Sequence, residues 1–358
     1  MYYLYPDYYK KFHCIADKCI DTCCAEWQIV IDDESLEKYR NYKGDYQQTL
    51  CQNIDWEEGV FGHNKRGKCA FLRDDDLCDM YIHMGEDSLC TTCREYPRHT
   101  EEFENLREIT LSLSCPEVAK IVMNTTKPIT FVTKEDETDE CYEEFDYFLF
   151  SELEDVREEM IRIIQDRNVN IRDRIDKILQ ISISVQRHYD AGSLISWNEF
   201  EESDRVCVEN EYELFERLFL FLFEEFEILY PQWAEVLVES RLFLFGEGKK
   251  VFEQNKEEFE TWWNTSNLTP LDIVLEQLVV YFISVYLLGA VYDENILGKV
   301  DACIGHTIEI YLLLLGRWLK HGELAMDDVI EVVYRYSREI EHSDENLERA
   351  EMLNWFAR

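Results

Sequence analysis

The cysteines are concentrated at one end of the chain, and this constrains its fold more than any other feature of the sequence. Ten of the 13 lie within the first 115 residues: Cys14, Cys19, Cys23, Cys24, Cys51, Cys69, Cys78, Cys90, Cys93 and Cys115. Disulfides explain this cluster poorly, since the total is odd, no export signal is visible, and a reducing cytosol does not maintain them. Thiolates at short spacings can instead surround one soft metal or cluster at little cost in loop entropy. We therefore predict a metal-binding module in the first third of the chain.

The spacing of the thiols leaves the identity of the metal open. The pattern is C-x4-C-x3-C-C, then C-x8-C-x11-C-x2-C, with Cys115-Pro116 further on. Eight thiols in two groups can build one four-iron cluster, two clusters, or two tetrahedral zinc sites. His63, His83 and His99 lie in the same region and are weaker candidates for ligands. The remaining thiols, Cys141, Cys207 and Cys303, have the isolated positions typical of ordinary buried cysteines.

The sequence changes to helical periodicity after an acidic run at residues 134–140. Apolar residues recur three and four positions apart in residues 143–166, 171–189, 209–229, 232–245, 250–263, 270–292, 295–320, 326–341 and 344–356. Only 13 glycines and 6 prolines are present, which also favours helices. The predicted fold is mainly α, with a small cysteine-rich, metal-binding α+β module at residues 1–126 and an acidic, all-helical domain at residues 143–358.

Local patterns within the module predict a few short elements. The tyrosine-rich residues 1–13 are expected to begin with a strand, and the alternation in residues 28–32 predicts another. Residues 34–51 have a weak helical pattern, a hairpin is expected between Cys69 and Cys78, and a helix is expected over residues 81–92.

The charge of the chain limits its partners. The 75 acidic and 36 basic residues give a formal charge of −39, which repels nucleic acid and anionic membranes. Such a surface attracts a basic partner or a lysine-bearing substrate, although a solvated acidic surface that only maintains solubility is the simpler interpretation. The longest apolar run, residues 278–291, is shorter than the roughly 20 residues of a membrane span. A core helix is therefore expected there, and a cytoplasmic location is predicted because no targeting segment is visible.

Three segments resemble the flagellin lysine-N-methylase family in order and spacing. They are FHCIADKCIDTCCAEWQIVID from residue 12, GKCAFLRDDDLCDMY from residue 67 and LCTTCREYPR from residue 89. The resemblance implies transfer of methyl groups from S-adenosylmethionine to the ε-amino groups of flagellin lysines. It also implies a cysteine-bound iron–sulfur cluster, which favours [4Fe–4S] over zinc. The ligands that it implies are Cys14, Cys19, Cys23, Cys24, Cys69, Cys78, Cys90 and Cys93.

No familiar site for S-adenosylmethionine is visible. The chain lacks the Gly-rich strand-to-helix loop of doubly wound methyltransferases and the C-x3-C-x2-C triplet of radical enzymes that use this cofactor. Methyl transfer requires a deprotonated lysine aligned with a sulfonium, which aromatic faces can hold. Trp27, Tyr96 and Arg98 lie inside the matched segments, and we consider them candidates for lining the cofactor site, although packing around the module is their simpler role. The alternatives are a non-catalytic, metal-stabilised interaction protein and an iron–sulfur electron-transfer protein.

Overall fold

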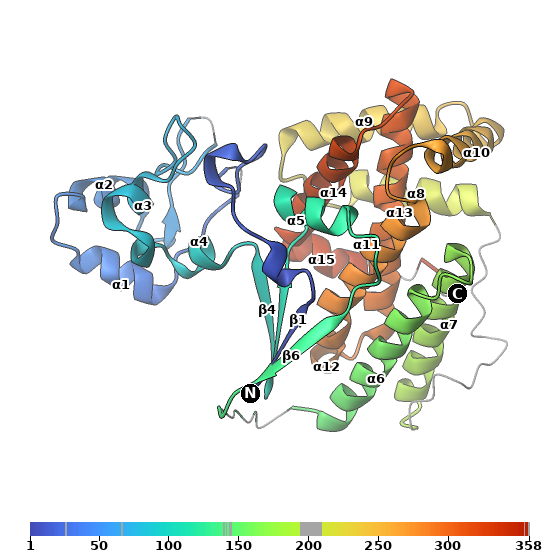
Figure 1. Cartoon of the computed structure of the whole chain (residues 1–358), viewed down its shortest axis with the longest axis horizontal. Helices are drawn as coiled ribbons and strands as arrows, with labels where there is room; N and C mark the ends of the chain where they lie inside the picture. Colours follow the sequence, from blue (N-terminus) through green and yellow to red (C-terminus); the bar gives the residue numbers. More distant parts are fainter. Residues whose placement is uncertain are drawn as a thin grey trace.

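The computed structural model describes residues 1–25, 27–65, 67–138, 140, 142, 145–193, 210–353 and 355–356. Figure 1 shows a small module on one side, a sheet in the middle and a larger group of helices on the other side. The elements assigned from residue 145 onward are all helical, and helices dominate the whole of the described chain. The prediction of a mainly α protein is therefore confirmed.

The sheet is built from strands far apart in sequence. Its order is β4 (Arg98–Phe103), β5 (Leu106–Leu111), β1 (Tyr2–Pro6) and β6 (Phe131–Glu135). β1 runs parallel to β5, whereas the pairs β4–β5 and β1–β6 are antiparallel. After β5, the short helix α5 (Pro116–Met123) begins with its proline in the first turn, where no N–H is needed. The sequence predicted β1, but the other three strands were not predicted.

The module is inserted between β1 and β4 and has a hydrophobic core of its own. Two 3-10 turns, η1 (Tyr9–Lys11) and η2 (Ala16–Lys18), lead into it from β1. Its core is formed by residues of the segment 29–90, among them Ile29, Ile31, Tyr39, Leu50, Phe61, Phe71 and Met80. Its elements are α1 (Asp33–Asn41), α2 (Gln47–Asn53), β2 (Ile54–Asp55), β3 (Val60–Phe61), α3 (Asp79–Met84), η3 (Glu86–Ser88) and α4 (Thr91–Glu95).

The short elements predicted for the module are partly wrong. Residues 28–32 form no strand, because their pairing is limited to one isolated bridge, Val30 to Val60, with backbone hydrogen bonds from Ile31 and to Ile29 on either side. The helix predicted over residues 81–92 is interrupted at Gly85, whose φ of 83° lies outside the helical region. The helix predicted over residues 34–51 is likewise split into α1 and α2. The hairpin between Cys69 and Cys78 is confirmed by the antiparallel bridge between Leu72 and Cys78.

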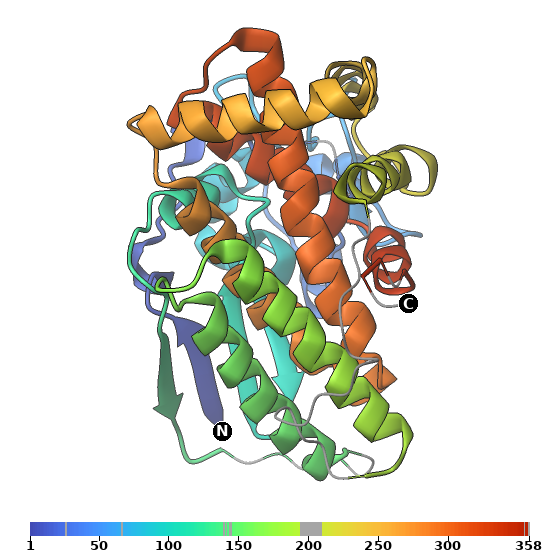
Figure 2. The same cartoon turned by 90° about the vertical axis from the view of Figure 1, so that its right-hand side faces the viewer.

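All nine predicted helical stretches contain a helix. They are α6 (Tyr147–Ile164), α7 (Ile171–Asp190), α8 (Glu211–Glu224), α9 (Pro231–Phe245), α10 (Lys249–Thr265), α11 (Leu271–Tyr286), α13 (Ile296–His321), α14 (Met326–Glu341) and α15 (Asp344–Glu351), with η5 (Leu287–Gly289) and α12 (Ala290–Asp293) after α11. The long α13 runs through the middle of this group and packs against α7, α9 and α11 (Figure 2). Periodicity was sufficient for most of these helices because they bury one face against their neighbours, whereas the central α11 and α13 are buried on nearly every side.

The sheet and α5 share one hydrophobic core with the helices. Residues from the first third of the chain, including Tyr8, Phe103, Leu111 and Val118, are buried in the same cluster as residues of α6 to α14. Residues 29–90 form the separate cluster. The domain ranges 1–126 and 143–358 stay a prediction. The two hydrophobic clusters separate the core of the inserted module from the core that the sheet and the helices share.

Within the part of the chain that the structure describes, two helical segments have the length and apolar composition that could cross a membrane. They are Leu271–Asp293 and Ile296–His321, and 78% of the most apolar window of each is buried inside the protein. Core helices have the same properties, so these segments are weak support for a membrane span. The core helix that was expected at residues 278–291 is present.

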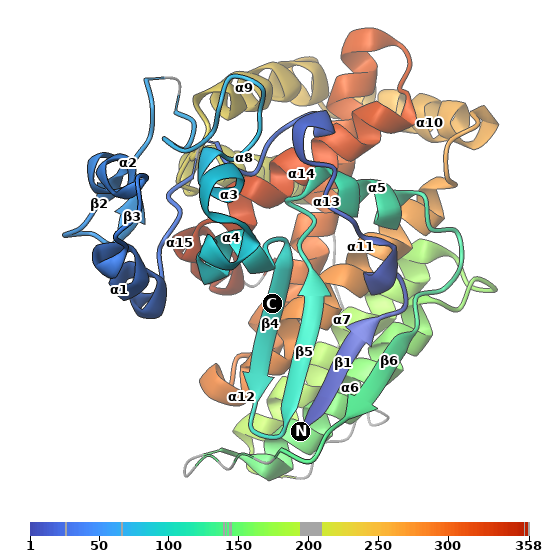
Figure 3. The ribbon, with the colours of Figure 1, turned by 60° about the vertical axis from the view of Figure 1, so that its left-hand side comes forward.

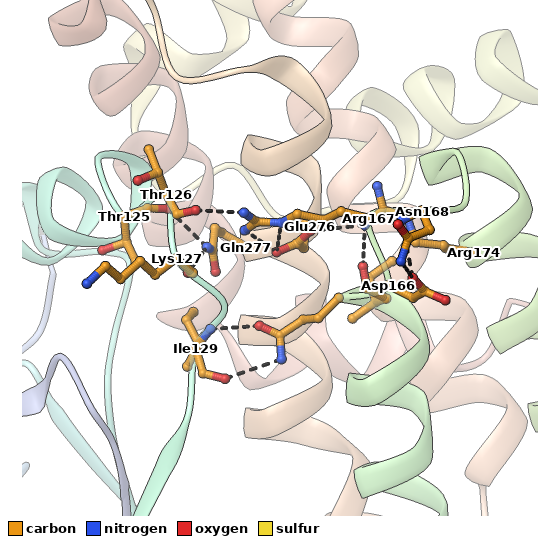
Figure 4. Close-up of polar contacts among 12 residues, drawn as sticks. Thr125, Thr126, Lys127, Ile129, Asp166, Arg167, Asn168, Arg174, Glu276 and Gln277 are labelled. Carbon is orange, nitrogen blue, oxygen red and sulfur yellow. Dashed lines mark hydrogen bonds and ion pairs between the residues drawn. The ribbon is translucent and has the colours of Figure 1, made fainter.

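A buried ion cluster ties the sheet side of the protein to the helices (Figure 4). The carboxylate of Glu276 on α11 is completely buried and accepts hydrogen bonds from Arg167 and Arg174. Arg167 also donates to the carbonyl of Thr126, and Gln277 donates to the carbonyls of Thr125 and Lys127. The connection between α5 and β6 is thereby fastened to α11 and to the turn that follows α6.

Candidate functional site

Five thiols come together inside the module. Cys24, Cys69, Cys78 and Cys93 line a cavity of about 20 Å³, and Cys90 hydrogen bonds to Cys93. The backbone N–H of Cys69 donates to the carbonyl of Cys24 over 2.8 Å, which joins the two predicted groups of ligands. We call these five residues the module thiols.

Four further thiols lie near one another where the module joins the sheet. Cys23 interacts electrostatically with Cys14 and Cys115, and Cys115 interacts in the same way with Cys14 and Cys19. We call these four residues the junction thiols. Sequence reasoning had not included Cys115 among the ligands, although the proline after it was a signal that could have identified it.

The electrostatics of both groups follow from burial and from thiol pairs. Burial raises the pKa of Cys69 to about 12 and that of Cys115 to about 11. The hydrogen bond between Cys23 and Cys24 lowers the pKa of Cys24 to about 7 and raises that of Cys23. Cys23 belongs to the junction thiols and Cys24 to the module thiols, so the two groups meet at this adjacent pair.

The thiols fit a soft metal by their chemistry. Among the described residues, no three Cys, His, Asp or Glu side chains have the placement of a finished metal site. The module thiols nevertheless supply four sulfur donors around one enclosed space, and sulfur is the donor that iron–sulfur clusters and structural zinc prefer.

The three histidines considered as ligands have protein partners. His63 Nε2 lies 3.0 Å from the carbonyl of Trp27, His83 Nδ1 lies 2.9 Å from that of Asp79, and His99 pairs with Glu101. Of the isolated thiols, Cys303 is buried in α13 as expected. Cys141 and Cys207 lie outside the described residues.

Two of the three candidate cofactor residues meet each other, and a histidine from the helical domain joins them. The rings of Trp27 and Tyr96 are 5.7 Å apart, and the imidazole of His342 stacks on Trp27 at 4.8 Å. His342 follows the end of α14, and Figure 3 shows this helix beside the base of the module. We call Trp27, Tyr96 and His342 the aromatic junction.

Arg98 does not belong to the aromatic junction. Its guanidinium lies over the rings of Tyr9 and Phe12 and donates a hydrogen bond to the Tyr9 hydroxyl over 3.0 Å. The cation close to the junction is instead Arg338 of α14, which was not predicted. Arg338 pairs with Asp21 at 3.0 Å and thereby connects the helices to the segment that carries the junction thiols.

His342 is neutral at physiological pH. Burial and the charge of Arg338 lower its pKa to about 4. Its Nδ1 lies 3.3 Å from the hydroxyl of Tyr230, whereas its buried Nε2 has no hydrogen-bond partner among the described residues. The junction thus offers the rings of Trp27 and Tyr96 and, in the tautomer in which Nδ1 donates to Tyr230, an acceptor at Nε2 with no partner among the described residues.

The comparison with known proteins identifies the family. Residues 157–356 match the FliB lysine N-methylase C-terminal domain, which is more than half of the chain. The chain belongs to the FliB lysine N-methylase family. The match runs from the middle of α6 to the residues after α15, a region in which no motif could be recognised from the sequence alone, and it includes His342.

Individual relatives from this family match a smaller part of the chain. The lysine-N-methylase of Salmonella typhimurium is 30% identical over 128 residues, which are 33% of this chain and 32% of that protein. The flagellar biosynthetic protein FliU of Salmonella muenchen is 30% identical over 128 residues, covering 75% of its length. The alignment therefore spans about a third of the lysine-N-methylase. No solved structure matches the chain.

Proposed function

We propose that this protein is a protein lysine N-methyltransferase that uses S-adenosylmethionine, with flagellin as its acceptor. The main support is the aromatic junction, in which Trp27 and Tyr96 of the segments that resemble the family meet His342 of the matched C-terminal domain. Membership of a lysine N-methylase family supports the reaction, and the flagellar name of one relative supports the acceptor.

The residues of the junction suit the requirements of a polar methyl transfer. S-adenosylmethionine supplies, when it is bound, an electrophilic methyl group on a sulfonium. Aromatic faces such as those of Trp27 and Tyr96 attract a sulfonium or an ammonium. A lysine ammonium placed beside them loses hydration, which lowers its pKa and favours loss of its proton to solvent. Nε2 of His342, which has no partner among the described residues, can orient the amine by a hydrogen bond, but the pKa of this histidine, about 4, is too low for it to keep the proton. With the cofactor bound, Trp27 and Tyr96 would hold the sulfonium, and its methyl group would pass to the lysine nitrogen as the carbon–sulfur bond breaks, which would leave a neutral thioether.

We further propose that the clustered cysteines hold a [4Fe–4S] cluster, with zinc as the alternative. The support is the soft donor set of the module thiols around one cavity. Anaerobically purified protein is expected to be brown and to contain iron and acid-labile sulfide in near-equal amounts. Stoichiometric zinc without sulfide would rule out the cluster.

The direct test of the reaction is mass spectrometry of flagellin produced with and without this protein. We expect mass increments of 14 Da on lysines, about the mass that one CH₂ adds, and we expect calorimetry to show that the metal-replete protein binds S-adenosylmethionine. His342→Asn should reduce methylation much more than Glu158→Gln, which changes an exposed carboxylate of α6. Unmodified lysines together with no cofactor binding would refute the methyltransferase and favour a metal-stabilised interaction protein. Binding of S-adenosylmethionine together with unmodified flagellin would refute only the proposal that flagellin is the acceptor.

A further inference from the structure

A groove of about 640 Å³ lies at the far end of the sheet from the aromatic junction. It is formed where β1 and β5 begin, where β4 and β6 end, and where the first half of α6 passes them. This end of the sheet is next to the label N in Figure 3. The groove is large enough for an amino-acid side chain and part of a peptide backbone.

Carboxylates dominate the polar lining of this groove. The only cationic group among its described lining residues is the α-amino group of Met1, which lies 3.6 Å from Asp136 Oδ1. The acidic lining residues are Glu104, Glu135, Asp136, Glu137 and Glu154. The groove therefore has an excess of negative charge that a cationic ligand would neutralise.

Glu104 shows that this charge is not ordinary surface charge. Its side chain lies at the turn between β4 and β5 and is only 5% exposed. Its Oε1 accepts a hydrogen bond from the backbone N–H of Tyr142, but its buried Oε2 has no partner among the residues that the structure describes. Elsewhere a buried carboxylate such as Glu276 is matched by two arginines. An unpaired carboxylate oxygen in the wall of a cavity is costly unless a ligand supplies the missing donor.

Glu154 adds a second carboxylate to the lining, and its charge is opposed only in part by Arg157, which pairs with Glu108. Glu154 projects from α6 and has no hydrogen-bond or ion-pair partner among the described residues. Burial raises its pKa, which shows that the groove withholds water from this group as well. A cation bound in the groove would stabilise the charged form of Glu154.

The apolar part of the groove is aromatic. Tyr2 and Tyr147 are about half exposed, whereas Phe103 and Phe150 are buried. Phe145 joins them, with its ring centre 5.1 Å from that of Phe150 and 5.7 Å from that of Tyr147. Rings next to carboxylates bind an alkylammonium well, because the methylene chain packs on the rings while the ammonium meets the carboxylates.

We propose that this groove is a docking site for a lysine side chain of the protein substrate, separate from the place where methyl transfer occurs. The identity of the ligand as a substrate lysine rests on the proposed function. The six residues of β4 separate the groove from the aromatic junction, a distance of roughly 20 Å at about 3.3 Å per residue. One lysine cannot reach both places, so the groove holds a second lysine of the same substrate while another is at the junction.

The test measures binding in the absence of S-adenosylmethionine, so that its result does not depend on methyl transfer. The probe is a synthetic peptide with several lysines, compared by calorimetry with the same peptide carrying ε-acetylated lysines. Glu104→Gln and Glu154→Gln should each weaken binding of the lysine peptide roughly tenfold, as expected for the loss of a hydrogen bond to a charged group. Glu158→Gln, one turn further along α6 and exposed, is the matched control and should bind within twofold of the natural protein.

The possible results separate this proposal from the proposed function. Tight binding of the acetylated peptide would overturn the proposal that the groove binds a lysine side chain. Equal affinities of Glu104→Gln, Glu154→Gln and Glu158→Gln for the lysine peptide would overturn it too. Displacement of the lysine peptide by spermidine at much lower concentration would also overturn it and indicate a polyamine site. Charge-dependent peptide binding in a protein that methylates nothing would support the groove and refute only the methyltransferase.

Discussion

The buried carboxylate of Glu276 provides a sharp test of what holds the helices to the sheet. Its two oxygens accept four hydrogen bonds of 2.7–3.2 Å from Arg167 and Arg174. Glu276→Gln keeps the shape of the side chain but removes the negative charge. Arg174, whose side chain is 3% exposed, would then be a buried cation without a counter-ion. Removing one partner of such a pair costs about 3–5 kcal/mol.

The size of the expected effect on thermal stability follows from the size of the chain. With 358 residues, the entropy of unfolding is roughly 0.75 kcal mol⁻¹ K⁻¹, so Tm should fall by about 4–7 °C if the protein unfolds cooperatively. The assay is thermal unfolding followed by circular dichroism and calorimetry. Glu159→Gln is the control, because Glu159 makes an equally short pair with Arg162, whose side chain is 65% exposed. Exposed pairs contribute at most about 1 kcal/mol, so its Tm should change by about 1 °C.

A double variant tests the cause that we assign to the loss. Glu276→Gln combined with Arg174→Met leaves no completely buried charge in the cluster, and Arg167 remains partly exposed and bound to the Thr126 carbonyl. Part of the lost stability should therefore return. Equal Tm values for Glu276→Gln and Glu159→Gln would refute the reasoning, and a double variant less stable than Glu276→Gln would show that packing by Arg174 matters more than charge.

Three further predictions concern other parts of the chain. Cys93→Ser should lose bound metal and soluble protein, measured by metal analysis and yield, whereas Cys303→Ser should retain its metal; equal retention would exclude a metal role for the cluster. The pKa of His342, lowered to about 4, implies a contribution to stability that is complete above about pH 6.5 and is lost as the pH falls towards 4. The free-energy gap between the natural protein and His342→Asn in urea unfolding should shrink over this range. The pH dependence of the stability contributed by Asp301 is expected to have the opposite sign, because burial raises the pKa of its carboxyl group to about 7. Relative to Asp301→Asn, the natural protein should lose stability as the pH rises from 4 to 7, and a constant difference would contradict this.

The helices could be predicted from the sequence because the information for each is local. Most helices of the larger core, such as α6, α7 and α14, repeat their apolar residues at the spacing of one face, whatever their neighbours are. The strands were harder to predict because their partners are distant. Tyr2 of β1 pairs with Leu106 on one side and with Glu135 on the other. β6 is largely exposed and overlaps the acidic run, which had suggested a region without structure.

The candidate site was predictable only in part, for the same reason. Trp27 and Tyr96 were identified because both lie within recognisable segments, and the structure brings their rings together. Arg98 lies in one of those segments as well, but the strand that follows turns it towards Tyr9. His342 could not be identified, because it lies 246 positions after Tyr96 in the chain and only the fold brings it to the junction.

The position of the module between β1 and β4 has a consequence for the evolution of this architecture. The chain leaves for the module at Trp27 and returns from it at Tyr96, and these two rings are 5.7 Å apart. A segment whose ends meet can be replaced, lengthened or lost without changing the register of the strands on either side. The module and the surrounding protein can therefore accumulate substitutions at different rates. We expect their ancestry to be separable, with cysteine-rich modules of this kind recurring in proteins that lack these helices.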